Sequence, residues 1–267
     1  MPSVASLHIH PIKSCRGHDV SEAALDRFGL AGDRRFLVVD ERGQFLTQRT
    51  LPRLALVEPT CAAGTITLAA PGMPVIEVNA TPSPDTPRLD VVIWRDTVVA
   101  ADLGSAVAAW LGAWLGRPAR LVAMPPEFSR PIRKATGRPG DESAFSDAYP
   151  LLVLSEASLA ELNGRLEEPL PMDRFRPNLV VRDCAAFAED TWRRIRIGDV
   201  VLRAAGACAR CIVTTTDQHT LERGKEPLRT LAQYRRSKDG DVNFGQNYIH
   251  EIKGGVLRVG LPVEVLE

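Results

Sequence analysis

The sequence predicts a β-rich α+β fold in two domains: first a β-barrel or sandwich, then a second strand-rich domain with peripheral helices. Three observations support this. The first hundred residues divide into short apolar runs separated by Pro and Gly, one amphipathic helix follows them, and further strand and helix patterns follow a polar linker. Short strands at close spacing, with turn residues between them, are typical of barrels and sandwiches.

The strands of the first domain are expected as follows. Val4–Ile12 alternates around two histidines, and Phe36–Val39 and Gln44–Gln48 flank a polar turn that ends in Gly43, which is a hairpin signal. Further short strands are expected at Leu54–Glu58, Thr65–Leu68, Val75–Val78, Leu89–Trp94 and Val98–Ala101.

The first helix is expected at Asp102–Gly116, where apolar residues recur on one helical face. Asp102 suits the N-cap and Gly116 suits the position just past the end. The following stretch, Met124–Glu142, is rich in Pro, Gly and charge, so we expect a linker loop there, or a lid over a site.

The second domain mixes strands and helices. Helices are expected at Ser155–Leu166 and Lys225–Arg235, and the chain closes with a hairpin of Val256–Val259 and Pro262–Leu266. The remaining strands are expected at Leu151–Leu154, Leu179–Arg182 and Ile195–Arg203.

Composition excludes several classes of function. The 267 residues include 33 basic and 33 acidic side chains, a formal net charge of +0, which disfavours a nucleic-acid or membrane-surface partner. The most apolar stretch, Ala106–Leu115, is far shorter than the roughly 20 residues that cross a bilayer. No secretory signal is seen at Met1–Val4, and the five cysteines do not form a disulfide pattern, so we expect a reducing cytoplasm.

The sharpest local motif is the C-x-x-C of Cys208 and Cys211, followed by the β-branched run Ile212–Thr216. A thioredoxin-like pair needs a strand–helix junction, and structural zinc usually needs four ligands, so neither fits well. Two buried thiols remain one interpretation. The other is a single thiolate that ligates a metal whose remaining ligands come from an organic cofactor, with Arg210 favouring the thiolate.

Candidate anion-binding residues follow expected strands at separate places in the chain. They are Lys13 with Ser14, Arg34 with Arg35, and the run Arg174–Asn178 that contains Arg176. Arginine suits planar, bidentate recognition of phosphate. Taken singly, each of these residues is better explained as a solvated surface charge.

Together these segments resemble the MOSC family. Pro11–Gly17 and Gly29–Phe36 are similar to its N-terminal β-barrel domain, whereas Phe145–Pro150, Phe175–Val180, Phe187–Trp192, Ile197–Asp199, Cys208–Cys211 and Lys225–Leu231 are similar to the MOSC domain itself. The resemblance covers nearly the whole chain and is nearest to the amidoxime reducing components, mitochondrial and bacterial. It implies an N-terminal β-barrel domain at residues 1–120 and a MOSC β-barrel domain with peripheral helices at residues 121–267.

The resemblance also implies a function, namely two-electron reduction of small N-hydroxylated substrates (N–OH to N–H) by a molybdenum-pyranopterin cofactor. The family's metal ligand maps to Cys211. Its cofactor-holding residues map to Lys13, Ser14, Arg34, Arg176, Asn178 and Arg210, and Asp147 maps to a catalytic position that orients the cofactor or relays a proton.

Two departures and one alternative accompany this resemblance. Ala209 stands where the family often has Ser. No dinucleotide fingerprint and no iron–sulfur cysteine cluster is present, so a separate electron-donor protein of ferredoxin, flavoprotein or cytochrome type is implied. The alternative function is a MOSC-type sulfur carrier or cofactor-transfer protein that uses Cys211.

Overall fold

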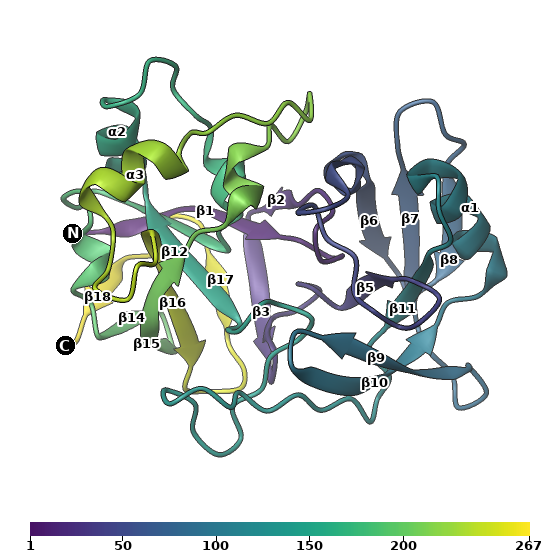
Figure 1. The fold of residues 1–267 in the computed structure, drawn as a ribbon. Helices are drawn as coiled ribbons and strands as arrows, with labels where there is room; N and C mark the ends of the chain where they lie inside the picture. Colours follow the sequence, from purple (N-terminus) through teal and green to yellow (C-terminus); the bar gives the residue numbers. More distant parts are fainter.

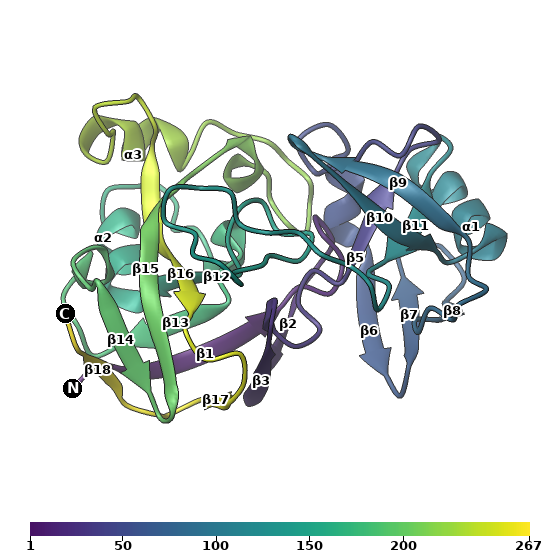
Figure 2. The ribbon, with the colours of Figure 1, turned by 90° about the horizontal axis from the view of Figure 1, so that it is seen from below.

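The computed structural model describes all 267 residues, which form two lobes lying side by side (Figures 1 and 2). Eighteen strands in four sheets dominate the chain, and only three α-helices accompany them. The expected β-rich α+β class is confirmed.

The first lobe consists of two small sheets, ordered β5-β11-β10-β9 and β6-β7-β8, with helix α1 packed beside them. Trp110, Leu111 and Trp114 of α1 are buried against β5, β7 and β11 and belong to a core cluster of this lobe, and a second cluster lies between β5, β9, β10 and β11. The element bounds are β5 (Phe36–Val39), β6 (Glu58–Ala62), β7 (Thr65–Ala69), β8 (Ile76–Asn79), β9 (Arg88–Ile93), β10 (Asp96–Asp102), α1 (Ser105–Leu115) and β11 (Arg120–Ala123).

The second lobe is built on one sheet of eight strands, ordered β18-β14-β15-β16-β12-β13-β1-β2. Only β12 and β13 pair in parallel. Helices α2 and α3 cover one end of the sheet, over a small core that contains Phe175 and Phe244. The bounds are β12 (Leu151–Ser155), α2 (Glu156–Asn163), β13 (Leu179–Arg182), β14 (Arg194–Ile197), β15 (Val200–Ala209), α3 (Leu228–Tyr234), β16 (Asn243–His250), β17 (Val256–Arg258) and β18 (Val263–Val265).

The strands of the first thirty residues pack with the second lobe, although they precede residue 120, whereas Ile12 and Cys15 between them belong to the core of the first lobe. Strand β1 (Ser3–Ile9) pairs antiparallel with β13 and with β2 (His18–Val20), while β3 (Glu22–Asp26) joins β17 and β4 (Gly29–Leu30). The expected domain boundary at residue 120 therefore follows the order of the sequence, but strands β1 to β4 before it pack with the domain after it. Because the chain enters the first lobe after β1 and again after β4, the loops that follow these strands lie between the lobes.

Three expected strands are wrong for identifiable reasons. Pro52–Leu56 is a 3-10 helix, because Pro52 sets a helical φ at its first turn, and the strand begins only at Glu58. The expected strand Ile195–Arg203 is a hairpin, since Gly198 turns the chain at φ 56°. The expected strand at Gln44–Gln48 makes only isolated bridges, Val39 with Phe45 and Gln44 with Val92.

The ends of the expected helices and hairpins also differ. The final strands β17 and β18 do not pair with each other, since β17 joins β3 and β18 joins β14. Helix α1 is capped by Gly104 rather than Asp102, although Gly116 ends it in the left-handed conformation as expected. Helix α3 begins at Leu228, later than Lys225.

The segment between β11 and β12 crosses from one lobe to the other without regular structure, as expected for Met124–Glu142 (Figures 1 and 2). Arg130 holds its second half in place. The buried guanidinium donates to the carbonyls of Ala144 and Ser146 at 2.8 and 2.7 Å and pairs with Asp96 of β10 at 2.8 Å. No helix in the structure is long and apolar enough to span a bilayer.

Candidate functional site

A pocket of about 370 Å³ lies between the lobes and brings all eight predicted site residues together. They are Lys13, Ser14, Arg34, Asp147, Arg176, Asn178, Arg210 and Cys211. A second cavity of similar volume, about 380 Å³, lies beside Cys61 and Met124 and contains none of them. Ligand sites are common at domain interfaces, and the first pocket alone combines a thiol with convergent charges.

Three pocket residues hold a left-handed backbone that non-glycine residues rarely adopt. Ser14, Arg34 and Arg176 have φ of 68°, 49° and 53°. Arg176 directly follows the 3-10 helix Met172–Phe175, and Ser14 and Arg34 lie in the turns after β1 and β4. Such conformations cost on the order of 1 kcal/mol or more each and tend to occur at functional sites. Strain at three positions around one pocket therefore supports a binding role for it.

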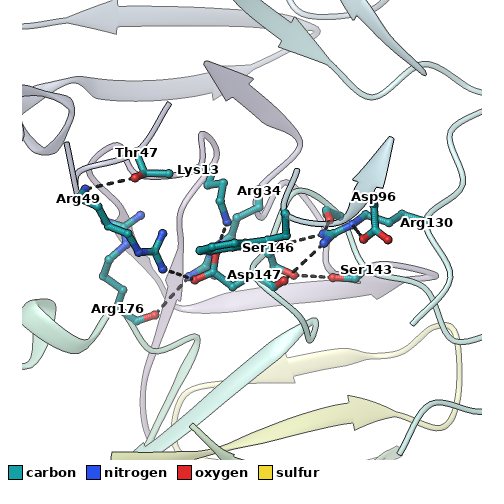
Figure 3. A network of polar contacts seen from close by, with 12 residues as sticks. Lys13, Arg34, Thr47, Arg49, Asp96, Arg130, Ser143, Ser146, Asp147 and Arg176 are labelled. Atoms are coloured by element: carbon teal, nitrogen blue, oxygen red, sulfur yellow. Dashed lines mark hydrogen bonds and ion pairs between the residues drawn. The ribbon is translucent and has the colours of Figure 1, made fainter. Parts of the chain in front are cut away.

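The carboxylate of Asp147 is the centre of a polar network in this pocket (Figure 3). It pairs with the Lys13 ammonium and accepts from Arg49 Nη2 at 3.2 Å, and Trp94 Nε1 also donates to it at 3.2 Å. The Asp147 side chain is 55% exposed, and desolvation by the surrounding groups opposes its ionisation, but the charges of Lys13 and Arg49 outweigh this and hold the pKa of the carboxyl well below its usual value. Asp147 therefore stays ionised at neutral pH.

Lys13 is buried beneath this carboxylate. Burial lowers the pKa of its ammonium to about 8, against the opposing effect of Asp147. Its charge at neutral pH consequently depends on a nearby anion, which in this structure is the Asp147 carboxylate.

Arg176 is a pocket cation without a protein partner. Its guanidinium makes no hydrogen bond or ion pair with the protein, although Arg34 donates to the Arg176 carbonyl at 3.3 Å. Burial, together with the charge of Arg34, lowers the pKa of Arg176 to about 10. Arg34 itself pairs with the buried Asp33 at 2.6 Å. These two neighbouring guanidinium groups, of which only Arg34 pairs with a carboxylate, suit the binding of an anion.

Two predicted residues have other partners in the structure. The Asn178 side chain bonds to the backbone. Its Oδ1 accepts from Leu152 N at 3.2 Å, and its Nδ2 donates to the His8 carbonyl at 3.3 Å. The Arg210 guanidinium donates to Cys208 Sγ at 3.0 Å and to the Phe175 carbonyl at 2.6 Å. It therefore contacts Cys208 and not, as expected, Cys211, because β15 ends at Ala209 and the chain turns there.

The two cysteines differ in their surroundings. Cys208 lies on β15, whereas Cys211 caps a 3-10 helix at Ile212–Thr215, which most of the β-branched run forms. No continuous strand connects the two cysteines. Both thiols are free and line the pocket, but only Cys208 receives a hydrogen bond from Arg210.

Several pocket residues were missed from the sequence. Arg49 and Lys134 add positive charge to the wall, Tyr149 adds an aromatic ring, and Trp94 contacts Asp147 from the β9–β10 turn. Arg49 also stacks on the Trp94 ring, 4.7 Å from its centre. Neither residue lies in a motif; their proximity arises only when the first lobe folds.

The residues present fit an anionic cofactor that carries its own metal. No three or more His, Cys, Asp or Glu side chains lie together to hold a metal ion, so a metal bound by Cys211 would take its other ligands from a cofactor. A phosphate would pair with Arg176, which has no protein partner, and with the neighbouring Arg34. The Cys211 thiol and the two arginine side chains line the same pocket, whose volume suits a cofactor.

Two strand-rich lobes with a cationic, thiol-bearing pocket between them define a MOSC protein. The family model described as the MOSC N-terminal beta barrel domain matches residues 1–118, and the MOSC domain model matches residues 140–264. The chain belongs to the family that joins these two domains, the family of the mitochondrial amidoxime-reducing components.

The relatives are similar over nearly the whole chain. Mitochondrial amidoxime-reducing component 1 of Mus musculus is 41% identical and covers 99% of this chain and 82% of its own length. The Homo sapiens protein of the same name is 40% identical, with 99% and 83% covered. Among solved structures, the YuaD protein of Bacillus subtilis matches 99% of this chain and 95% of its own at 11% identity and a TM-score of 0.42.

Proposed function

We propose that this protein reduces N-hydroxylated compounds, N–OH to N–H, with a molybdenum-pyranopterin cofactor. The relatives named amidoxime-reducing components, at 41% and 40% identity, support the reaction class. The observation in this chain that carries the proposal is the unpaired Arg176 guanidinium beside Arg34, in the same pocket as the free thiol of Cys211.

In this proposal the pocket residues divide into two groups. Arg34 and Arg176 hold the cofactor phosphate through charged hydrogen bonds, with Lys13 and Ser14 beside them. Cys211 supplies one soft thiolate to the metal. When bound, the cofactor would supply the two electrons that, with two protons, convert N–OH to N–H and water, while the protein would bind and orient both reactants.

The test is metal and pterin content together with turnover. Protein expressed in a cofactor-competent host should contain about one molybdenum and one pterin per chain, the ratio that a single thiolate ligand implies. It should also reduce benzamidoxime to benzamidine with chemically reduced viologen. A protein that carries a persulfide on Cys211 and no molybdenum would instead support the sulfur-carrier alternative.

We further propose that electrons come from a separate protein, because no dinucleotide fingerprint follows any strand of this chain. Pure protein should therefore not turn over with NADH alone, although it does so with reduced viologen. Rapid NADH oxidation coupled to benzamidoxime reduction, without any other protein, would contradict this.

We also propose where in the cell the protein is located. The Cys211 thiolate has to stay reduced to ligate a metal, so we propose a reducing compartment, the cytoplasm. Fractionation of cells that express the tagged protein would check this, and recovery with an organelle would contradict it.

A further inference from the structure

Two buried glutamines face each other across the boundary between the lobes. Gln48 of the first lobe donates from Nε2 to Gln218 Oε1 at 3.0 Å, and Gln218 Nε2 donates back to Gln48 Oε1 at 3.2 Å. Their exposed fractions are 0% and 5%. Neither side chain lines the pocket, so neither would touch a bound cofactor.

Each glutamine is also fixed to backbone beside the pocket. Gln48 Nε2 donates to the Ser14 carbonyl at 2.8 Å, and Gln218 Nε2 donates to the Thr216 carbonyl at 3.0 Å. Ser14 lines the pocket, and Thr216 follows the short helix that begins after Cys211. Since a carbonyl only accepts, these contacts set the orientation of both amides.

Arg223 connects the same two segments a second time. Its guanidinium donates to the carbonyls of Gln48 at 3.0 Å and Arg49 at 3.3 Å, while its Nε donates to Thr216 Oγ1 at 3.0 Å. Thr216 and Arg223 form a β-bridge, so the loop between them is one unit that reaches the first lobe. Arg49, the residue it holds, lies in the pocket wall.

We infer that Gln48, Gln218 and Arg223 form an interlobe latch that positions the Ser14 and Arg49 side of the pocket against the Cys211 side. A buried amide without a partner is strongly disfavoured, so both amides are satisfied only when the lobes take this one placement. The latch rests on the proposed function for its purpose: a cofactor held by residues of both sides needs them at a fixed separation.

The first test uses apo protein and hydrogen–deuterium exchange. Gln48→Leu should speed exchange at residues 212–224 in the other lobe, and Gln218→Leu should speed exchange at residues 12–16 and 46–50, each at least about tenfold. Gln44→Leu is the matched control, because Gln44 is exposed and its side chain makes no hydrogen bond. Changes confined to the substituted lobe would overturn the latch.

The second test separates positioning from stability. The double variant Gln48→Leu with Gln218→Leu removes both buried amides, so its thermal stability should recover toward the wild type. The Ser14 and Thr216 carbonyls still lose their donors, and bound pterin should therefore dissociate about tenfold faster than from the wild type. Joint recovery of stability and pterin retention would show a purely structural role. If the wild type takes up no pterin, the proposed function fails and the exchange experiment alone decides the latch.

Discussion

At the scale of single residues, Asp147 is the side chain whose interpretation the structure changes most. The family resemblance assigns it a catalytic position that orients the cofactor or relays a proton. Its carboxylate is instead surrounded by Lys13, Arg49 and Trp94, with its pKa held well below the usual value. A general acid or base works best with a pKa near the operating pH. We therefore interpret Asp147 as a counter-ion. It keeps Lys13 charged, and it pairs with Lys13 and Arg49 until another anion binds to them.

A sulfate titration tests this interpretation, because sulfate does not itself change charge between pH 6 and 9. In Asp147→Asn the competing carboxylate is gone, so sulfate should bind several-fold tighter at pH 6. The pKa of Lys13 is about 8 with Asp147 present and should fall in the variant. Because Lys13 then loses its charge at a lower pH, sulfate affinity should begin to decline at a lower pH in the variant than in the wild type. Calorimetric titration measures both; Asp85→Asn, an exposed acid, is the control. Identical profiles for Asp147→Asn and the wild type would refute the counter-ion role.

The two cysteines give a second prediction. Cys211→Ser replaces a soft thiolate with a hard, largely protonated hydroxyl, so benzamidoxime reduction should fall by orders of magnitude. Cys208→Ser should keep most activity, since Cys208 makes only hydrogen bonds, accepting from Arg210 at 3.0 Å and donating to the Ala209 carbonyl at 4.0 Å, which a serine hydroxyl can also form. Pterin content is measured in parallel, because phosphate contacts should retain part of the cofactor in both variants. Equal loss in the two variants, or a Cys208–Cys211 disulfide that cycles during turnover, would favour a dithiol mechanism.

The candidate site was predictable where the residues lie in recognisable motifs. Lys13, Arg34, Arg176 and Cys211 belong to such segments, and all four line one pocket. Partnerships between distant residues were not predictable. Residues 49, 94 and 147 meet only through the packing of a loop, a hairpin and the interlobe segment, and no local spacing encodes that contact.

At the scale of elements, apolar patterns located the strands better than their ends. Most strands of both lobes lie within the expected ranges, because alternation reports which face is buried. The errors occur where a local backbone constraint outweighs an apolar or β-branched run. Pro52 converts one run to a 3-10 helix, and Gly198 splits another into a hairpin. Ile212–Thr215 likewise forms a helical turn, in which Thr214 and Thr215 hydroxyls donate to backbone carbonyls three residues earlier.

The left-handed turn at Arg176 allows its side chain and its backbone to be tested separately. Arg176→Ala and Arg176→Gly both remove the guanidinium, so each should weaken pterin binding about ten- to a hundredfold, the equivalent of roughly 1.5–3 kcal/mol for a charged hydrogen bond. Glycine adopts φ 53° without the penalty of a Cβ, so the Gly variant should be more stable in apo form by about 1 kcal/mol.

Urea unfolding of the apo variants, alongside bound pterin per chain, measures both effects. Arg34→Ala and Arg34→Gly should repeat the pattern at the neighbouring turn, where φ is 49°. Unchanged pterin content in all four variants would show that these arginines are ordinary surface residues. Equal stability of the Ala and Gly forms would show that the backbone relaxes at these turns.

At the scale of the whole molecule, long-range polar contacts tie together parts of the chain that the sequence keeps apart. The return of β1 to the second sheet brings residues near the N-terminus against strands formed nearly 180 positions later, as in the pairing of Ser3 with Arg182. A domain boundary assigned by chain order does not show this, because strand pairing depends on matching edges and not on sequence distance. The interlobe pocket results from this arrangement, because residues of both lobes line its walls.

One such contact predicts how the stability of the whole protein depends on pH. His250, fully buried at the end of β16, donates from Nε2 to the Asp26 carbonyl of β3 at 2.6 Å, while its Nδ1 has no partner. Burial, aided by the nearby Lys253, lowers the pKa of His250 to about 4. Below the unfolded-state pKa of about 6.5, the unfolded chain takes up a proton that the folded chain refuses, so stability should fall as the pH drops from 6.5 to 4.

The size of the effect follows from the same pKa. Because one pKa unit corresponds to about 1.36 kcal/mol, His250 contributes a loss of at most about 3 kcal/mol between those pH values. His250→Gln keeps an amide donor for Asp26 but cannot be protonated, so its unfolding free energy should decline less steeply over this range. His18→Gln, which alters an exposed histidine, should follow the wild type. Urea unfolding at pH 7, 5.5 and 4 gives the unfolding free energy of all three proteins. If this free energy declines equally with pH in the wild type and in His250→Gln, another residue causes the acid sensitivity. The next residue to test would be His10, which is buried beside Arg34.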